Sequence, residues 1–580
     1  MMEELNVNDS NCLNSPSSAP ASPRTLSWKC VEKKWNQVQV GHQGSYSVER
    51  LELLDHYCNN TSLIRVILVC LFTPLPSLAV AVILECLPLK PPSVGWAANW
   101  MFWVRVSLMT LFMNLAGASQ ANLFLPGYNQ MVRKVIYASV AITILQTGTF
   151  ILEAVVVGFP MPFMWQTGAV TTGIYAPIVG RFINGPALFV QGSALAQHHK
   201  RFFNSFLLQM ALIGVFPLCS VLYDVMARSY RGIVVIILPI WKFAAKRFAV
   251  RMIHELEVVP ELVAFSVDFF SALFVSVCMS TSGSFHLAAL FIAVDLLFAL
   301  MKFRVLQKNE KVLRQLLQDR RRYLSSKLTK SEPSGLLSMI LEVVRTPRAY
   351  RVTSLDRVRL WASPPHRVPE KLSERLQQLG KSGIFGDLKR NSFYQQAPKN
   401  HFSSWKFRQI SVVAAPMTIV PVATQVPPNL RKESNVRPTD PSKYLVLHGL
   451  QLLFNCEYLV LVEYIECVVP FIYVIYKSVL EQLPNVVYFP GGAGHWDIPA
   501  VTNLLVYGVL EIGSLILLHV FLQRKFGFSP LYQLAFVLET QASAIQAHLF
   551  PVTIFLLQYQ LAHLGVDFTF RFNWLRDKRE

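Results

Sequence analysis

Five carboxylates lie within long apolar runs of this sequence: Asp268, Asp295, Glu463, Glu466 and Glu511. An ionised side chain at the centre of a membrane span costs at least about 2.5 kcal/mol, so such residues are rare without a role. A buried carboxylate can bind a proton or a cation, or it can pair with a basic residue on a neighbouring helix. These five residues are therefore the candidates for ion or proton binding.

Asp268 and Asp295 lie in consecutive apolar runs that are joined by a short turn at Ser282-Gly283. Since a helix rises about 1.5 Å per residue, two antiparallel helices would hold these carboxylates at nearly the same depth. If they face each other, their repulsion favours a proton or a cation between them. The alternative is an ordinary salt network with basic residues of the preceding run, namely Lys242, Lys246 or Arg247.

Glu463 and Glu466 are three residues apart and therefore lie on one face of a helix. Glu511 lies midway along the next run, which predicts a matching depth. Pro470 would kink the first of these helices, and a kinked helix with mid-membrane carboxylates is a common form of cation site. The alternative is that Arg105, in the middle of an earlier run, is the counter-ion and locks the two halves of the protein together.

The apolar runs that carry these residues have the length of membrane-spanning helices, about 20 residues each. The composition agrees, because 52% of residues are hydrophobic and only 15% are charged, against about 25% charged in soluble proteins. We expect an all-α, polytopic helical membrane protein with about eleven transmembrane helices. The predicted spans are 63–88, 96–119, 134–158, 165–182, 205–225, 232–247, 261–281, 284–303, 446–480, 499–522 and 537–562. Pro74 and Pro76 should break the first span.

A basic segment divides these spans into eight and three. Residues 302–443 contain 28 Lys and Arg against ten Asp and Glu, which is +18 of the chain's formal net charge of +19. Basic connecting segments stay on the cytoplasmic side, so this segment and the N-terminus are predicted to be cytoplasmic. Arg320, Arg321 and Arg322 are candidates for contact with anionic lipid headgroups. No nucleic-acid-binding pattern accompanies the charge.

The basic segment is either a solvated linker held near the membrane or a regulatory domain that binds phosphoinositide or a cytosolic partner. Helical spacing predicts that the preceding span continues through 302–326, and that a second helix covers 369–380. The expected organisation is a disordered cytoplasmic tail (1–62), an eight-span lobe (63–303), a basic linker (304–445), a three-span lobe (446–562) and a C-terminal tail (563–580).

The sequence contains none of the common enzyme motifs. GxxxxGK[ST], GxSxG, HExxH and a helix-opening GxGxxG are all absent, and the nine cysteines show no CxxC and no Cys/His cluster at metal-ligand spacing. We therefore expect no enzyme activity, no cofactor and no metal site of the Cys/His type.

Several segments are distinctive: Tyr46–Leu51, Pro260–Val263, Val267–Phe270, Glu463–Pro470, Phe526–Pro530 and Gln533–Thr540. Together they resemble a large set of uncharacterised multi-pass membrane proteins known mostly from oomycete genomes. The resemblance runs from about residue 46 to the end of the chain. It implies a multi-pass membrane protein and carries no activity.

The leading hypothesis is a secondary transporter or channel for a cation or a cation-coupled solute. Its rival is a membrane scaffold or receptor whose buried charges only pair helices, and a third candidate is an enzyme that acts on lipid. A hydrated cavity at the carboxylates would favour transport. Carboxylates closed onto Arg105 and Lys246 without a cavity would favour the scaffold.

Overall fold

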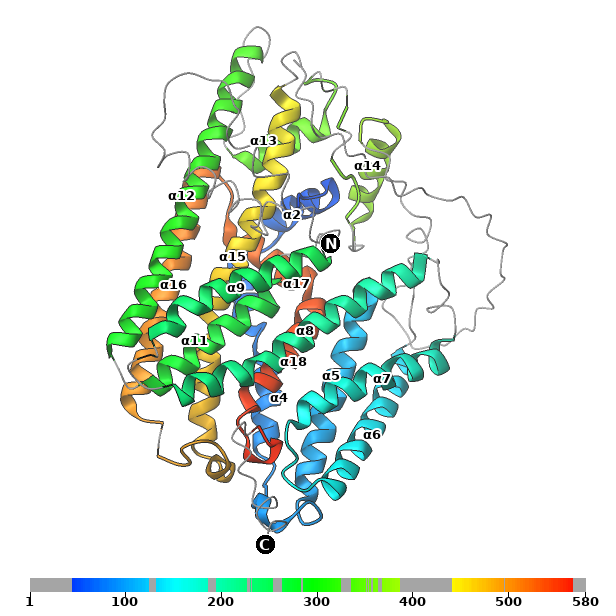
Figure 1. The fold of residues 1–580 in the computed structure, drawn as a ribbon. Coiled ribbons are helices and arrows are strands. Elements are labelled where there is room, and N and C mark those ends of the chain that lie inside the picture. Colours follow the sequence, from blue (N-terminus) through cyan, green and yellow to red (C-terminus); the bar gives the residue numbers. More distant parts are fainter. Residues whose placement is uncertain are drawn as a thin grey trace, which may run out of the picture.

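The computed structural model describes 44–124, 132–185, 194–226, 232–253, 263–282, 285–324, most of 335–385, 441–494 and 496–566. The described part of the chain is all-α, as the sequence predicts, and its isolated β-bridge joins Leu355 to Phe385. Figure 1 shows long helices packed side by side, with a group of shorter helices at one end.

The N-terminal half contributes the first membrane-length helices. Its elements are α2 (Val48–Asn60), α3 (Leu63–Phe72), α4 (Leu75–Glu85), α5 (Trp100–Phe124), α6 (Val132–Val156) and α7 (Met164–Asn184). The break between α3 and α4 falls at Thr73 and Pro74, because proline at the start of α4 cannot continue the hydrogen bonding of α3. This confirms the predicted interruption of the first span.

The middle of the chain supplies helices that cross the long axis obliquely, together with one that runs along it (Figure 1). These are α8 (Ala194–Val225), α9 (Gly232–Ile253), the π-helical turn η6 (Ala264–Asp268), α11 (Phe269–Ser282) and α12 (Phe285–Leu324). Helix α12 continues without a break from the predicted span into the basic segment, so the predicted continuation is confirmed. Arg320, Arg321 and Arg322 lie in its last turns.

The C-terminal half builds the centre of the molecule. It contains α15 (Pro441–Leu480), α16 (Ile498–Phe526), α17 (Pro530–Thr540) and α18 (Ala542–Gln558). In α15, 78% of the most apolar window is buried, against 28% in α16, so α15 is the central helix around which the others pack. Helices α12 and α16 lie beside it (Figure 1).

The number of membrane spans is smaller than the sequence predicted. Within the described residues, five segments are long and apolar enough to cross a membrane: Leu63–Glu85, which joins α3 and α4, and the helices α5, α6, α15 and α16. The number is six if the pair α17–α18, bent by 81°, forms one broken span. The count of eleven is not supported, because no further helix within the described residues meets the same criterion of length and composition. The five or six helices still make this a candidate multi-pass membrane protein.

Part of the expected tail and linker is folded at the end of the molecule where α15 begins. Val48–Asn60, expected within a disordered tail, forms α2, and Arg345 of α13 (Leu336–Arg345) donates to both carboxylate oxygens of Glu52 at 2.8 and 2.6 Å. The predicted second helix of the basic segment is confirmed as α14 (Glu370–Lys381). A bidentate guanidinium–carboxylate contact of this kind fixes α2 against α13.

We expect Gly449→Val to detach α13 from α15. Gly449 lets the two helices approach so closely that a Cβ atom there would lie 2.9 Å from Cγ1 of the fully buried Ile340. Overpacking of this kind costs about 1–3 kcal/mol. Thermal unfolding in detergent, with proteolytic release of α13 as a second readout, measures the loss. Gly513→Val on α16, where a Cβ atom meets nothing within 4 Å, is the matched control and should unfold close to the wild-type temperature.

Candidate functional site

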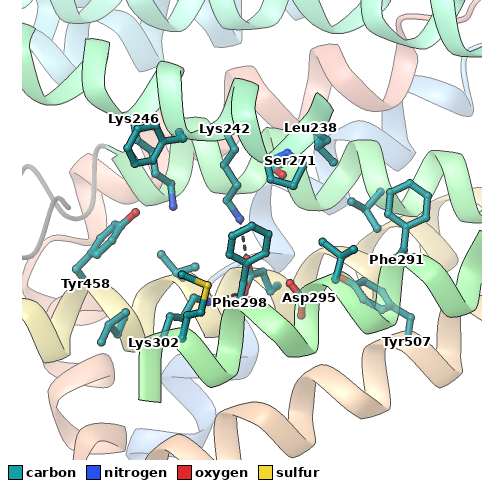
Figure 2. Close-up of a pocket in the computed structure, with 18 residues that line it drawn as sticks. Leu238, Lys242, Lys246, Ser271, Phe291, Asp295, Phe298, Lys302, Tyr458 and Tyr507 are labelled. Carbon is teal, nitrogen blue, oxygen red and sulfur yellow. Dashed lines mark hydrogen bonds and ion pairs between the residues drawn. The ribbon is translucent and has the colours of Figure 1, made fainter. Parts of the chain in front are cut away.

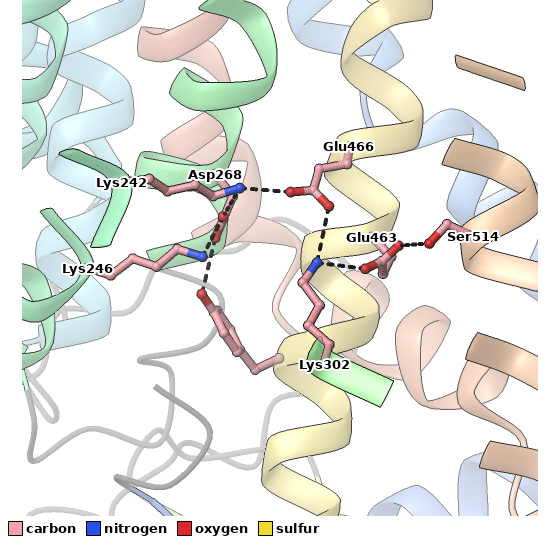
Figure 3. Close-up of polar contacts among 8 residues, drawn as sticks. Lys242, Lys246, Asp268, Lys302, Glu463, Glu466 and Ser514 are labelled. Carbon is pink, nitrogen blue, oxygen red and sulfur yellow. Dashed lines mark hydrogen bonds and ion pairs between the residues drawn. The ribbon is translucent and has the colours of Figure 1, made fainter. Parts of the chain in front are cut away.

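A buried network of carboxylates and lysines lies where α9, η6, α12, α15 and α16 meet (Figure 3). Its carboxylates are the five singled out in the sequence, and its cations are Lys242, Lys246 and Lys302. The network therefore combines residues from both halves of the chain, and neither half could form it alone.

Asp268 is held by the two lysines of α9. Its Oδ1 atom lies 3.0 Å from Nζ of Lys242 and 2.7 Å from Nζ of Lys246, and Tyr458 donates to its other oxygen at 3.3 Å. Asp268 is fully buried at the end of the π-helical turn η6. Of the two alternatives for this residue, the structure shows the salt network. The direct pairing of Asp268 with Asp295 is not what forms, since Asp295 lies beside Glu511.

Glu463 and Glu466 lie on one face of α15, as their spacing predicts, and both contact Lys302 of α12. Nζ of Lys302 lies 2.7 Å from Glu463 and 3.4 Å from Glu466, and Ser514 of α16 donates to Glu463 at 2.7 Å. Glu466 also accepts a hydrogen bond from Lys242 at 2.8 Å. Lys242 thus bridges Asp268 and Glu466 and joins the two groups of carboxylates.

The prediction that Arg105 is the counter-ion of these glutamates is wrong. Nη2 of Arg105 lies 2.5 Å from Oε1 of Glu85 on α4, and the same oxygen accepts a hydrogen bond from Tyr476 at 2.6 Å. Both charged residues are essentially fully buried. Arg105 has a nearer partner because α4 and α5 are consecutive helices of one lobe, and the glutamates of α15 are neutralised from α9 and α12.

Glu511 of α16 completes the acidic part of the site. One carboxylate oxygen from each of Glu463, Glu466 and Glu511 lies within 4.8 Å of the others, a spacing at which three oxygens can ligate one metal ion. Asp295 of α12 lies close enough to Glu511 for the two carboxyl groups to interact. A hydrogen bond between two carboxyl groups requires a proton on one of them. The structure thus brings together the three glutamates for which the sequence predicted a matching depth.

The network carries more carboxylates than lysines. Five carboxyl groups face three ammonium groups, a formal balance of −2 if all eight are ionised. An uncompensated charge is expensive in a low-dielectric site, so the balance favours uptake of protons or of a cation. Asp295 and Glu511 are the two carboxyls for which the described residues provide no direct lysine contact within 4 Å, so the excess falls on them.

A cavity of about 170 Å³ adjoins this network (Figure 2). Its polar lining includes Lys242, Lys302, Asp295, Glu466 and Tyr507, and the rest is mostly apolar. This volume exceeds the roughly 30 Å³ that one water occupies in the liquid, so the cavity can hold several waters or a partly hydrated ion. The site therefore has both features that were expected to separate the two hypotheses: carboxylates paired with lysines, which favour the scaffold, and a cavity, which favours transport.

A second buried network lies on α15 nearer its N-terminal end. Tyr46 donates a short hydrogen bond to Glu457, and Arg50 donates to the other oxygen of Glu457 at 2.7 Å. Gln533 of α17 donates to the Tyr46 hydroxyl at 2.8 Å. Burial raises the pKa of Tyr46 well above its ordinary value, and the adjacent Glu457 carboxylate adds to the rise. This network attaches the segment before α2 to the helical core.

Sequence reasoning missed several residues of the main site: Lys302, Tyr458, Tyr507 and Ser514. Lys302 was counted with the basic segment, although it lies only seven residues, about two helical turns, beyond Asp295. That spacing placed it on the same face as Asp295 and could have identified it. The hydroxyl residues carry no comparable pattern.

Comparison with family models, with curated proteins and with solved structures finds no match to this chain. Evidence on function therefore comes from the network and from the cavity beside it.

Proposed function

We propose that this protein is a secondary transporter or channel for a cation or for a cation-coupled solute, and that Asp295, Glu463, Glu466 and Glu511 bind the ion. The observation that carries the proposal is a cavity of about 170 Å³ beside a network with two more carboxyls than lysines. Excess buried negative charge next to open space is the arrangement that a site for an exchangeable cation requires.

The residues of the site divide into two roles in this proposal. Lys242 and Lys302 are fixed counter-charges that hold the helices together through Asp268, Glu463 and Glu466. Asp295 and Glu511 share a proton in the contact described above and exchange it for a cation. Loss of one proton and binding of one monovalent cation leaves the charge of the network unchanged, which keeps the cost of exchange low.

Local features of the helices support movement at this site. Pro470 lies in α15 four residues beyond Glu466, and Pro239 lies in α9 three residues before Lys242. Asp268 ends a π-helical turn, an irregularity that is common at functional sites. Each feature removes or displaces a backbone hydrogen bond next to a charged residue of the network, so the helices can bend there.

The second candidate function is a membrane scaffold or receptor. The observation that favours it is that Asp268, Glu463 and Glu466 already have lysine partners, as purely structural charges would. In that case the basic segment recruits anionic lipid, with Arg320, Arg321 and Arg322 as contacts, or recruits a partner protein. In both candidates we propose that the basic segment and the N-terminus are cytoplasmic, that the protein is not an enzyme, and that it belongs with the oomycete proteins it resembles.

We expect the double variant Asp295→Asn, Glu511→Gln to lose at least ten-fold of any proton- or cation-dependent flux in reconstituted vesicles. The two amides keep the size and the hydrogen bonding of the pair but can neither release a proton nor supply negative charge. Fluxes of protons, Na⁺, K⁺ and Ca²⁺ are measured with ion-selective dyes, and thermal unfolding checks that the variant is folded.

Glu153→Gln is the matched control, since Glu153 is a half-buried carboxylate of α6 outside the network, whose contact with the Thr167 hydroxyl an amide oxygen can keep. It should leave flux unchanged. Transport is excluded if the wild-type protein carries none of the four ions, or if the double variant matches the wild type. The scaffold candidate then remains.

A further inference from the structure

A second cavity lies in line with the first along the contact between α12 and α15. It has a volume of about 250 Å³ and is lined by Asn309, Val312 and Leu313 of α12 and by His448, Gln451, Leu452 and Asn455 of α15. Four of these seven side chains can hydrogen-bond to water or coordinate a cation through oxygen or nitrogen. Asn455 is a buried polar side chain of α15.

The contact between Lys302 and Glu463 fixes how the two helices align. Since α12 and α15 run antiparallel, one turn from Lys302 along α12 brings Leu306 to the level of Leu459, and the next turn brings Asn309 near Asn455. Leu459 lines the cavity beside the carboxylates, and Asn309 and Asn455 line the second cavity. The two cavities are thus separated by about one helical turn.

Leu306 lies in that turn. It is fully buried and lines neither cavity, although Lys302 before it and Asn309 after it on the same face each line one. A leucine between two cavities that both carry polar side chains excludes water from the connection, and hydrophobic constrictions of this kind close ion pathways by dewetting.

We propose that the second cavity is the entry vestibule for a small hydrated cation, and that Leu306, opposite Leu459, is the barrier between it and the buried carboxylates. The vestibule is lined by the N-terminal part of α15, the part nearer the end of the molecule that carries α2, α13 and α14 (Figure 1). The inference rests on the proposed function for the identity of what passes. The existence of the route does not depend on transport and can be tested without it.

The test uses cysteine reporters on α15. Gln451→Cys lies in the vestibule and Val462→Cys in the buried cavity. Each is exposed to 2-aminoethyl methanethiosulfonate, a small cationic thiol reagent, and labelling is followed by peptide mass spectrometry, which separates the reporters from the nine native cysteines. We expect Val462→Cys to react at least ten-fold more slowly than Gln451→Cys.

Leu306→Ser should raise the labelling rate of Val462→Cys at least ten-fold and leave that of Gln451→Cys unchanged. Leu306→Ala, which removes the same apolar atoms but adds no polar atom, should act in the same direction. Leu549→Ser, an equally buried leucine on α18, controls for general loosening and should change neither rate.

Equal labelling of the two reporters in the wild type, or no response of Val462→Cys to both Leu306 variants, would overturn the proposal. The labelling and flux measurements test the route and the proposed function independently. If Leu306→Ser opens the buried cavity but none of the four ions is transported, the route stands and the proposed function fails. If flux depends on Asp295 and Glu511 but labelling ignores Leu306, the proposed function stands and this route fails.

Discussion

Replacing Arg105 by methionine is expected to lower the free energy of unfolding by about 3–5 kcal/mol, the cost of leaving a buried charge without its partner. Arg105 and Glu85 are essentially fully buried and 2.5 Å apart, so neither can reach water when the other is removed. Tyr476 keeps its hydrogen bond to Glu85 at 2.6 Å but carries no charge to replace the guanidinium. Thermal or denaturant unfolding in detergent measures the loss.

The double variant Arg105→Met, Glu85→Met should recover most of this stability, because two apolar side chains of similar length replace the ion pair. Recovery stays incomplete, since the Tyr476 hydroxyl loses its acceptor. Arg65→Met is the matched control: Arg65 pairs with Glu539 at an exposed position, where ion pairs contribute little, and the variant should unfold as the wild type does. A double variant less stable than Arg105→Met would mean that Arg105 is held by something other than Glu85.

Local sequence patterns predicted those features of the fold that depend on local geometry. Pro74 ends α3 because it removes a backbone donor, and the 369–380 pattern forms α14 because its leucines recur at helical spacing. Glu463 and Glu466 share a face for the same reason. The predicted spans placed Glu511 at the same depth as Glu463 and Glu466, and the structure brings these three carboxylates together.

Features that depend on tertiary contacts could not be predicted in this way. The stretch Val48–Asn60 was misjudged as disordered: the partners of its buried charged residues include Arg345 and Glu457, which lie 293 and 407 residues away in the sequence. The count of spans also failed because an apolar run does not fix the length of its helix: the predicted span 261–281 contains the shorter apolar helix Ala264–Ser280. Glu85 was overlooked because it ends α4, next to the predicted end of a span.

The buried network satisfies the structural requirement of both functional candidates. Asp268 forms ion pairs with Lys242 and Lys246, as expected for a carboxylate whose role in a scaffold is purely structural. Asp295, in contrast, lines the cavity and contacts another carboxyl instead of a lysine. A purely structural network gains nothing from the last two carboxyls, because they add repulsion and desolvation cost without an ion pair. This excess is why we prefer ion binding.

Lys302→Met should make the stability of the protein depend on added cation. Lys302 contributes the ammonium group between Glu463 and Glu466, and its removal leaves five carboxyls against two lysines. We expect a loss of about 3–5 kcal/mol in the absence of metal ions. If the glutamates then bind Ca²⁺, the variant regains about 2.7 kcal/mol at a concentration 100 times its dissociation constant. The wild type should gain little, because its own ammonium group already lies between these carboxylates.

Unfolding temperatures measured across a Ca²⁺ titration, with choline chloride at equal ionic strength as the reference, would show this rescue. Lys302→Arg keeps the charge and should need no cation. Lys525→Met, which removes a partly exposed lysine 3.7 Å from Glu310, should cost no more than about 1 kcal/mol and should not respond to Ca²⁺. A destabilised Lys302→Met that no cation rescues would mean that the glutamates pair helices and do not form an ion site. An undiminished stability would mean that Lys302 is not the counter-charge on which they depend.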